Sequence, residues 1–182
     1  MKLIELTQGR VALVDDEDFE WLSQWKWYYH RYRKTGYAMR NGPSPKRGLI
    51  LMHVTILQRH KRWACGRGID HINMCGCDNR KENLRLATSS ANGMNAGLRL
   101  DNTSGVKGVN WHKAGRKWQA RICINQKETF LGLFTDMDDA IKAREQAEIK
   151  YFGKYRHDLS NVCPLGSTGE CPDCAQRLRE LQ

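Results

Sequence analysis

The segment from Gly68 to Asn95 constrains the fold of this chain more than any other, because its pattern changes three times within 28 residues. A short apolar run is followed by a loop rich in Asn, Asp and Gly, then by a run that alternates around Leu84 and Leu86, and finally by a polar stretch of helical type. Loop residues of this kind favour turns, and strict alternation favours strands. The segment therefore predicts two short strands joined by a polar loop and followed by a helix.

Each of the three predicted elements of this segment carries polar residues of types that are common in catalytic sites. They are Asp70-His71, Asn83-Leu84 and Asn92, with 12 residues from His71 to Asn83 and 9 from Asn83 to Asn92. This pattern resembles the HNH nucleases, and among them the phage and intron-encoded homing endonucleases in the variant with Asn where the second His usually stands. The resemblance implies a ββα-metal finger that holds a divalent ion and a histidine against the scissile phosphate. The alternative is that each asparagine serves turn chemistry alone.

The chemistry of phosphodiester hydrolysis gives each of these residues an expected role. A neutral imidazole can take a proton from water near pH 7, which makes His71 the expected general base. Hard oxygen ligands suit Mg²⁺ or Mn²⁺, so Asp70 and the amide oxygen of Asn92 are the expected metal ligands. We expect Asn83 to hydrogen-bond to the His71 ring and orient it. Asn95 lies one helical turn after Asn92 and could share or take its role.

Two features near the finger are interpreted as structural. His53 matches a histidine that such relatives carry upstream, but Val54 replaces the Arg that often follows it, so we expect a structural role. Cys65 precedes the first strand, and Cys75 and Cys77 follow it. A five-residue strand separates its ends by roughly 16 Å, whereas a zinc–thiolate bond is about 2.3 Å long. We therefore exclude a single zinc ion shared by these cysteines.

Residues 100–153 predict a second unit of three strands and one helix. Trp118, Ala120, Ile122 and Ile124 alternate with polar residues, and acidic residues open the helix that follows the third strand. The segment resembles the AP2/ERF DNA-binding domain through four features: Gly108-Val109, Trp118-x-Ala120-x-Ile122, Leu131-Gly132-x-Phe134 and an Ala-rich helix. The resemblance implies a sheet that lies in the DNA major groove with the helix packed behind it.

Basic and acidic residues are distributed unevenly within this unit. Residues 101–127 contain six basic and one acidic side chain, and residues 128–152 contain three basic and six acidic ones. Arg reads guanine and Asn or Gln reads adenine, while Lys more often contacts phosphate. By position in the resemblance, the expected DNA contacts are Lys107, Asn110, His112, Arg116, Gln119 and Arg121. Phe130 falls where relatives carry an exposed aromatic, so a groove contact is possible there. The alternative is a small basic α+β module that binds RNA or protein.

The ends of the chain carry weaker patterns. In the N-terminal segment we expect Trp25, Trp27 and Tyr29 to form a small core, with stacking on nucleic acid as the alternative. In the tail, His157, Cys163, Cys171 and Cys174 offer a possible Cys₃His zinc site. A flexible tail with thiols is the favoured interpretation, because one Cys-x-x-Cys with irregular partners is not specific.

Composition and motifs together predict a DNA-processing protein. Lys and Arg number 30 against 20 Asp and Glu, a formal net charge of +10, which favours a polyanionic partner. No apolar run approaches the roughly 18 residues that cross a bilayer, and the first residues lack a secretory pattern. We therefore expect a cytoplasmic protein, in the host cell if phage-encoded, with reduced cysteines and no membrane partner.

The expected fold class is α+β. Four parts are predicted: an aromatic and basic segment (1–48), the HNH domain (49–99), the AP2-like domain (100–153) and a tail (154–182). The predicted function is site-specific hydrolysis of double-stranded DNA to a 5′-phosphate and a 3′-hydroxyl. One finger cuts one strand, so a monomer would nick, and a double-strand break would need a homodimer or a second event. The alternatives are a non-catalytic DNA-binding regulator that keeps the HNH scaffold and an RNA-binding protein.

Overall fold

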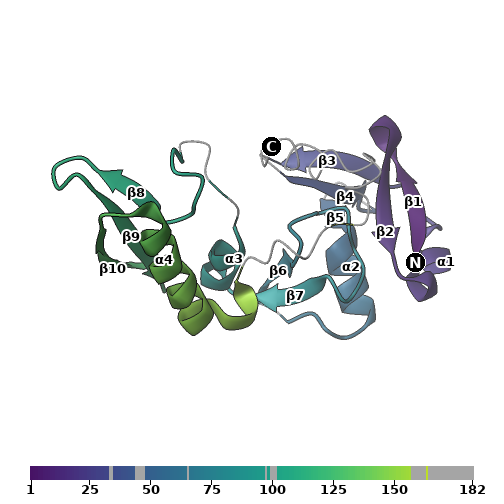
Figure 1. Ribbon diagram of the computed structural model, residues 1–182. Coiled ribbons are helices and arrows are strands. Elements are labelled where there is room, and N and C mark those ends of the chain that lie inside the picture. The colour runs from purple at the N-terminus through teal and green to yellow at the C-terminus, as the bar shows by residue number, and fades with distance from the viewer. Residues whose placement is uncertain are drawn as a thin grey trace. The chain divides into compact units, whose positions relative to one another are not determined.

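A computed structural model describes most of the chain and shows both helices and strands, as the α+β class predicts (Figure 1). The described residues are 1–32, 35–43, 48–64, 66–96, 98, 102–156 and 163. They belong to two compact units, one of residues 1–87 with 158–182 and the other of residues 88–157. None of the helices in these described ranges has the length and apolar character that crossing a bilayer requires.

The first unit combines three small antiparallel sheets with two helices. Its elements in chain order are β1 (Lys2–Leu6), η1 (Thr7–Gly9), β2 (Arg10–Val14), α1 (Asp16–Leu22), β3 (Tyr28–Tyr32), β4 (Thr35–Asn41), β5 (Leu49–Leu51), α2 (Met52–Arg59), β6 (Gly68–His71) and β7 (Leu84–Ala87). The strands pair as β1-β2, β3-β4-β5 and β6-β7. The acidic residues Asp16, Glu17 and Asp18 in the first turn of α1 interact favourably with its N-terminus.

One hydrophobic core joins the N-terminal segment to the following residues. Leu13 on β2, Trp27 before β3, Met52 on α2 and Leu84 on β7 all belong to the same buried cluster. The prediction that the N-terminal aromatics form a core is confirmed for Trp27 and Tyr29, which are buried, with Trp25 packed against them. The predicted boundary near residue 48 does not coincide with the observed division, because the segment before it contributes nine of the 16 buried residues of this shared core.

The second unit places one helix against a three-stranded sheet. Its elements are α3 (Ser89–Asn95), β8 (Val109–His112), β9 (Lys117–Ile124), β10 (Lys127–Phe134), α4 (Met137–Phe152) and η3 (Gly153–Tyr155). The sheet is antiparallel in the order β10-β9-β8, and the Asp136 side chain caps α4. The three predicted strands and the helix are confirmed. The helix α3, however, falls in this unit rather than in a segment ending at residue 99.

The two faces of this sheet differ as the alternation predicts. Val109, Ala120 and Ile122 are buried and pack with Ala140 and Ala147 of α4. The opposite side of the sheet, which we call the open face, is turned away from α4. Through the strand register it carries Asn110, His112, Lys117, Gln119, Arg121, Cys123, Glu128, Phe130 and Leu133.

Candidate functional site

The strand pair β6-β7 places Asp70 and His71 on opposite faces of one ribbon. Asp70 lies opposite Arg85 in the register, and His71 lies opposite Leu84. Asp70 is 5% exposed, and its Oδ2 accepts a hydrogen bond from Arg85 Nε at 2.7 Å and lies 2.6 Å from Arg85 Nη2. No motif in the sequence points to Arg85. Its position opposite an acid becomes visible only with the register of the strands.

The His71 ring is 6% exposed and lies within a group of three rings. The centroid of His53 on α2 is 4.9 Å from that of His71, with the ring planes at 89°. Tyr37 on β4 is 5.6 Å from His53 and 5.9 Å from His71. His53 Nδ1 is buried and has no hydrogen-bond partner among the described residues. His53 is therefore part of the surroundings of His71, a placement that the sequence analysis missed, and nothing in the sequence pointed to Tyr37.

Burial determines the protonation of both histidines. It lowers the pKa of His71 below the ordinary value of 6.5, although a hydrogen bond with the Asn79 side chain and the negative charges of Asp78 and Asp70 act in the opposite direction. Burial also lowers the pKa of His53 well below 6.5, with a further contribution from His71. Because a lowered pKa favours the neutral ring, both imidazoles are neutral at pH 7. A neutral His71 can accept a proton.

Asn83 makes its hydrogen bonds to the loop between the strands. Its Oδ1 accepts from the Asn73 backbone N–H at 3.0 Å, and its Nδ2 donates to the Asp78 carbonyl oxygen at 2.7 Å. The sequence predicts that this side chain orients the His71 ring. The hydrogen bonds described for Asn83 fix the path of the loop, and its role beside the His71 ring stays a prediction. Several asparagines share this loop, so spacing alone does not distinguish their partners.

The loop forms a buried polar network rather than a simple turn. The Asp78 carboxylate is fully buried, accepts from Arg80 at 2.8 and 2.9 Å, and accepts from Asn73 Nδ2 at 2.8 Å. This ion pair raises the pKa of Arg80 above its ordinary value. The strand β2 also meets the loop, since Leu13 N–H donates to the Cys77 carbonyl oxygen at 2.8 Å. These bonds hold the backbone that follows His71 in one conformation.

The two helical asparagines differ in accessibility. Asn92 is exposed on α3, whereas Asn95 is buried. Exposure leaves the amide oxygen of Asn92 accessible to a ligand, which favours Asn92 over Asn95 for the metal-binding role. Both residues belong to the second unit, and Asp70 and His71 belong to the first.

The expected DNA contacts of the second unit divide into two groups. Asn110, His112, Gln119 and Arg121 share the open face, and Arg116 lies in the turn between β8 and β9. Lys107 is placed differently: its Nζ donates to the carbonyl oxygens of Gly93 (2.9 Å), Met94 (3.1 Å) and Ala96 (2.9 Å) at the end of α3. Burial lowers the pKa of Lys107. Its ammonium group binds a helix C-terminus, where a cation is favourable.

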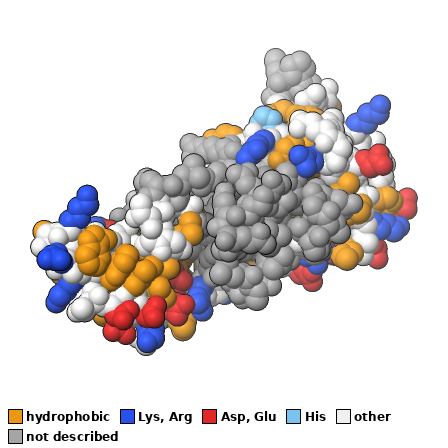
Figure 2. Space-filling model, turned by 45° about the horizontal axis from the view of Figure 1, so that its top comes forward, with side chains coloured by type: hydrophobic (Ala, Val, Ile, Leu, Met, Phe, Trp, Pro, Cys, Tyr) orange, Lys and Arg blue, Asp and Glu red, His pale blue; other side chains and the backbone are white. Residues whose placement is uncertain are grey.

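Polar contacts connect side chains within the open face. Arg121 Nη1 donates to Glu128 Oε2 at 3.0 Å, and Arg121 Nη2 donates to Gln119 Oε1 at 2.5 Å. His112 Nδ1 accepts from the Gly115 backbone N–H at 3.0 Å. Figure 2 shows hydrophobic, basic and acidic side chains together on the visible face of the second unit. The open face therefore offers hydrogen-bonding groups.

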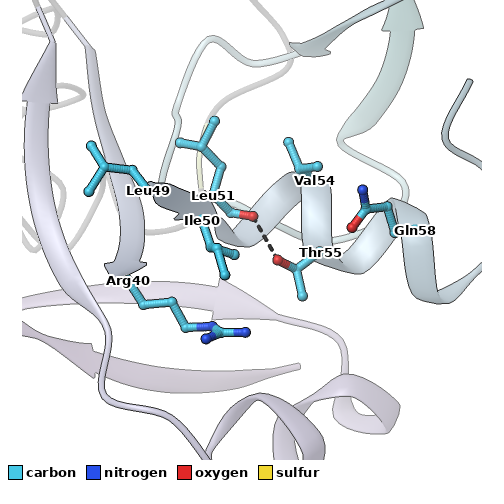
Figure 3. A pocket seen from close by; sticks show the side chains of 7 residues that line it. All are labelled: Arg40, Leu49, Ile50, Leu51, Val54, Thr55 and Gln58. Atoms are coloured by element: carbon cyan, nitrogen blue, oxygen red, sulfur yellow. Dashed lines mark hydrogen bonds between the residues drawn. The ribbon is translucent and has the colours of Figure 1, made fainter. Parts of the chain in front are cut away.

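Two further features of the first unit do not belong to this site. A hollow of about 320 Å³ lies between β4, β5 and α2, lined by Arg40 and by mostly apolar side chains (Figure 3). The ligand-type atoms of Glu17, Asp18 and His60 lie within 4.8 Å of one another. However, Asp18 already pairs with His60 Nε2 at 2.8 Å, and Lys81 pairs with Glu17. These charges link α1 to α2 and to the loop before β7, and we assign no ion to them.

Three of the four cysteines that the structure describes contribute to packing, and Cys123 is exposed. Cys75, Cys77 and Cys163 are buried in the core of the first unit. Cys65 and the other expected members of the tail zinc site, His157, Cys171 and Cys174, lie outside the described residues. Burial of Cys163 among apolar side chains gives it a packing role in this structure.

Comparison with known proteins gives one partial likeness. The chain is 35% identical over 63 residues to "Protein 3.8" of Escherichia phage T7. The match covers 35% of this chain and 52% of that protein, so the chain spans about half the length of the curated relative that it matches. No family model matches the chain, and no solved structure matches it.

Proposed function

We propose that this chain is a metal-dependent DNA endonuclease of the HNH type whose second unit binds the target duplex. The observation that carries the proposal is the setting of His71. This residue is a buried neutral imidazole next to an acid in sequence, and it lies beside His53, whose Nδ1 lacks a partner among the described residues. Buried polar atoms are normally satisfied, so an orphaned nitrogen beside a candidate base supports a site that a substrate completes.

In the proposed reaction the chain supplies the base and the metal ligands. His71 accepts a proton from water as the water oxygen bonds to phosphorus. The bond from phosphorus to the 3′ oxygen breaks, and that oxygen is protonated by solvent. Asp70 and Asn92 would hold Mg²⁺ or Mn²⁺, ions that prefer such hard oxygen ligands. When bound, the ion stabilises negative charge on the phosphoryl and leaving oxygens. We retain the expected products, a 5′-phosphate and a 3′-hydroxyl.

The order of the elements along the chain supports the two family resemblances. The order strand, polar loop, strand and helix is that expected of an HNH finger, and a three-stranded antiparallel sheet with one packed helix is that expected of an AP2-like domain. The four open-face residues Asn110, His112, Gln119 and Arg121 are of the types that read base edges. The partial likeness to a phage protein agrees with the proposed phage origin.

A specific contact favours the alternative, a DNA-binding regulator without catalysis. Asp70 already pairs with Arg85 across the ribbon, so its charge is neutralised in the absence of a metal ion. If Asp70 remains paired with Arg85 when DNA and a divalent ion are present, Asp70 does not bind the ion. The finger is then a scaffold, and the protein binds DNA without cleaving it. The two functions differ in one observable, which is whether the phosphodiester bond breaks.

The test is relaxation of supercoiled plasmids that carry candidate native loci. We expect nicking or linearisation with Mg²⁺ or Mn²⁺ and none with EDTA. The substitution His71→Ala should lower the rate by about 10² to 10⁴-fold, the usual contribution of a general base. The control is His30→Ala, because His30 is exposed on β3 of the same unit. Equal DNA binding by all variants with no metal-dependent cleavage would instead establish the regulator.

A further inference from the structure

Two large apolar side chains stand exposed on the open face of the second unit. Phe130 is 57% exposed and Leu133 is 39% exposed. In the register Phe130 lies opposite Arg121, and Leu133 lies opposite Gln119. The apolar side chains are therefore cross-strand neighbours of the two residues best suited to read bases. Exposed apolar groups rimmed by polar ones mark a surface that another molecule covers.

A β-bulge is what brings these two side chains to the same face. Residues 130 and 133 are an odd number of positions apart, so a regular strand would point them to opposite faces. The register shifts between Phe130 and Gly132, and Leu131 becomes the extra residue, packed toward α4. Gly132 has φ +150°, and a Cβ there would come within 2.8 Å of the Phe134 ring. The bulge thus depends on glycine, and bulges often re-aim side chains at functional sites.

The side chains around Phe130 and Leu133 fit duplex DNA better than they fit another protein. The open face mixes amide, imidazole and guanidinium groups with one acid, Glu128. Basic residues lie at both ends of the long strands, with Lys113 and Arg116 in one turn and Lys127 at the start of β10. Eight residues of β9 extend over roughly 23 Å, which exceeds the groove width of about 12 Å. The basic ends would therefore meet the phosphates on either side of a groove that holds the centre of the sheet.

We propose that Phe130 and Leu133 contact the C5-methyl groups of thymine in the major groove. This methyl group is the apolar feature of the base-pair edges in that groove, and contact with it is a known use of Phe and other apolar side chains. The recognised duplex then contains thymine next to the bases read by Gln119 and Arg121. The inference rests on the proposed DNA-binding function of the second unit and adds a base preference to it.

The experiment uses the full chain and a randomised duplex pool in EDTA, so that no cleavage occurs. Bound sequences are selected, and one selected duplex is then prepared with thymine or with deoxyuridine, which lacks only the methyl group. We expect the affinity of the wild type to fall about fourfold for each contacted methyl group that is removed. Phe130→Ala and Leu133→Ala should bind the thymine duplex more weakly and lose the difference between the two duplexes. Ile149→Ala, an exposed apolar residue on α4, is the matched control.

Three results would overturn the proposal. Equal affinity of the wild type for the two duplexes excludes methyl contacts, and so does a selected sequence without thymine. A change of Phe130→Ala from dimer to monomer, with DNA affinity intact, would show that the patch binds a second copy of the chain. Failure of the proposed function gives a distinct result, because the wild type would then bind neither duplex and the selection would not enrich any sequence.

Discussion

At the scale of single residues, burial gives His53 and His71 their chemical character. Both side chains lie within a group of three rings, and burial is the first cause of their lowered pKa values. The same burial that keeps His71 neutral for proton acceptance makes protonation of either ring costly in the folded state. Because of this cost, the free energy of unfolding of the protein depends on pH, as the proposed activity does.

We predict that acid destabilises the protein through these two histidines. Both folded pKa values lie below 6.5, the value expected of the unfolded chain. Their contribution to stability is therefore fully present above pH 6.5 and is lost as the pH falls toward the folded values, because the unfolded chain binds the protons first. Each histidine contributes a slope of at most about 1.4 kcal/mol per pH unit. Urea denaturation between pH 7.5 and 5 measures the slope.

The variant His53→Gln should show a shallower pH dependence of the free energy of unfolding than the wild type. His30→Gln, which changes an exposed histidine, should leave the slope unchanged. An identical slope in the wild type and in His53→Gln would contradict the assignment of a neutral buried His53.

We predict opposite effects for two asparagines of the proposed finger. Asn83→Ala removes the partners of two main-chain groups, the Asn73 N–H and the Asp78 carbonyl, and should lower the free energy of unfolding by roughly 2 to 4 kcal/mol. Asn92→Ala changes an exposed side chain and should alter stability by no more than about 0.5 kcal/mol, while it abolishes metal-dependent cleavage. Thermal or urea denaturation combined with plasmid nicking measures both. A destabilised Asn92→Ala would argue against a ligand role.

At the scale of secondary-structure elements, Lys107 connects α3 to the turn before β8. Its ammonium group donates to three carbonyl oxygens at the end of α3. Met94 on the same helix packs with Ile122 and Phe152. A short helix of seven residues is marginal alone, so these contacts attach it to the three-stranded unit.

We predict that Lys107 stabilises this attachment and contributes little to phosphate binding. Lys107→Met should lower the stability of the protein and leave the salt dependence of DNA affinity unchanged. Lys117→Met, on the open face, should instead reduce the slope of log affinity against log salt by about 0.9, the value for one phosphate contact. Fluorescence anisotropy over a salt series measures both slopes. An equal loss of slope in the two variants would restore Lys107 as a DNA contact.

At the scale of the whole molecule, the chain has two strongly basic stretches: residues 21–69, which contain eleven basic and no acidic side chains, and residues 101–127. Of the six basic residues in 101–127, Lys107 donates to the end of α3 and Arg121 donates to Glu128 and Gln119, which leaves four that can meet phosphates. The acidic residues of this unit lie mainly on α4, behind the sheet. This distribution favours a duplex bound on the open face.

We predict a steep salt dependence for the full chain. Four phosphate contacts give a slope of roughly −3.6, so affinity for a DNA duplex should fall about 150-fold between 50 and 200 mM salt. The same measurement with single-stranded RNA tests the RNA-binding alternative, because flexible strands give a smaller slope per contact. Tighter binding of the RNA than of the duplex at every salt concentration would contradict the proposed partner.

Local patterns in the sequence predict several of the strands, the starts of helices and part of the candidate site. The alternation in residues 117–124 predicts both the strand and the division of its side chains between the two faces, because a strand exposes every second residue. Acidic residues before α1 and α4 predict where these helices begin. The adjacency of Asp70 and His71, and the strand–loop–strand order around them, can also be seen in the sequence. All of these features depend on residues a few positions apart.

Only the tertiary structure decided which distant residues meet. Residues 1–48 share a core with 49–87, His53 and Tyr37 lie beside His71, and Asn83 bonds to the Asn73 and Asp78 main chain. Lys107 binds a helix end, and one extra residue at Leu131 turns Phe130 and Leu133 to the same face. The physical reason is common to these cases. Hydrogen-bond partners, burial and strand register depend on how separate elements pack, and sequence periodicity records only the neighbours along the chain.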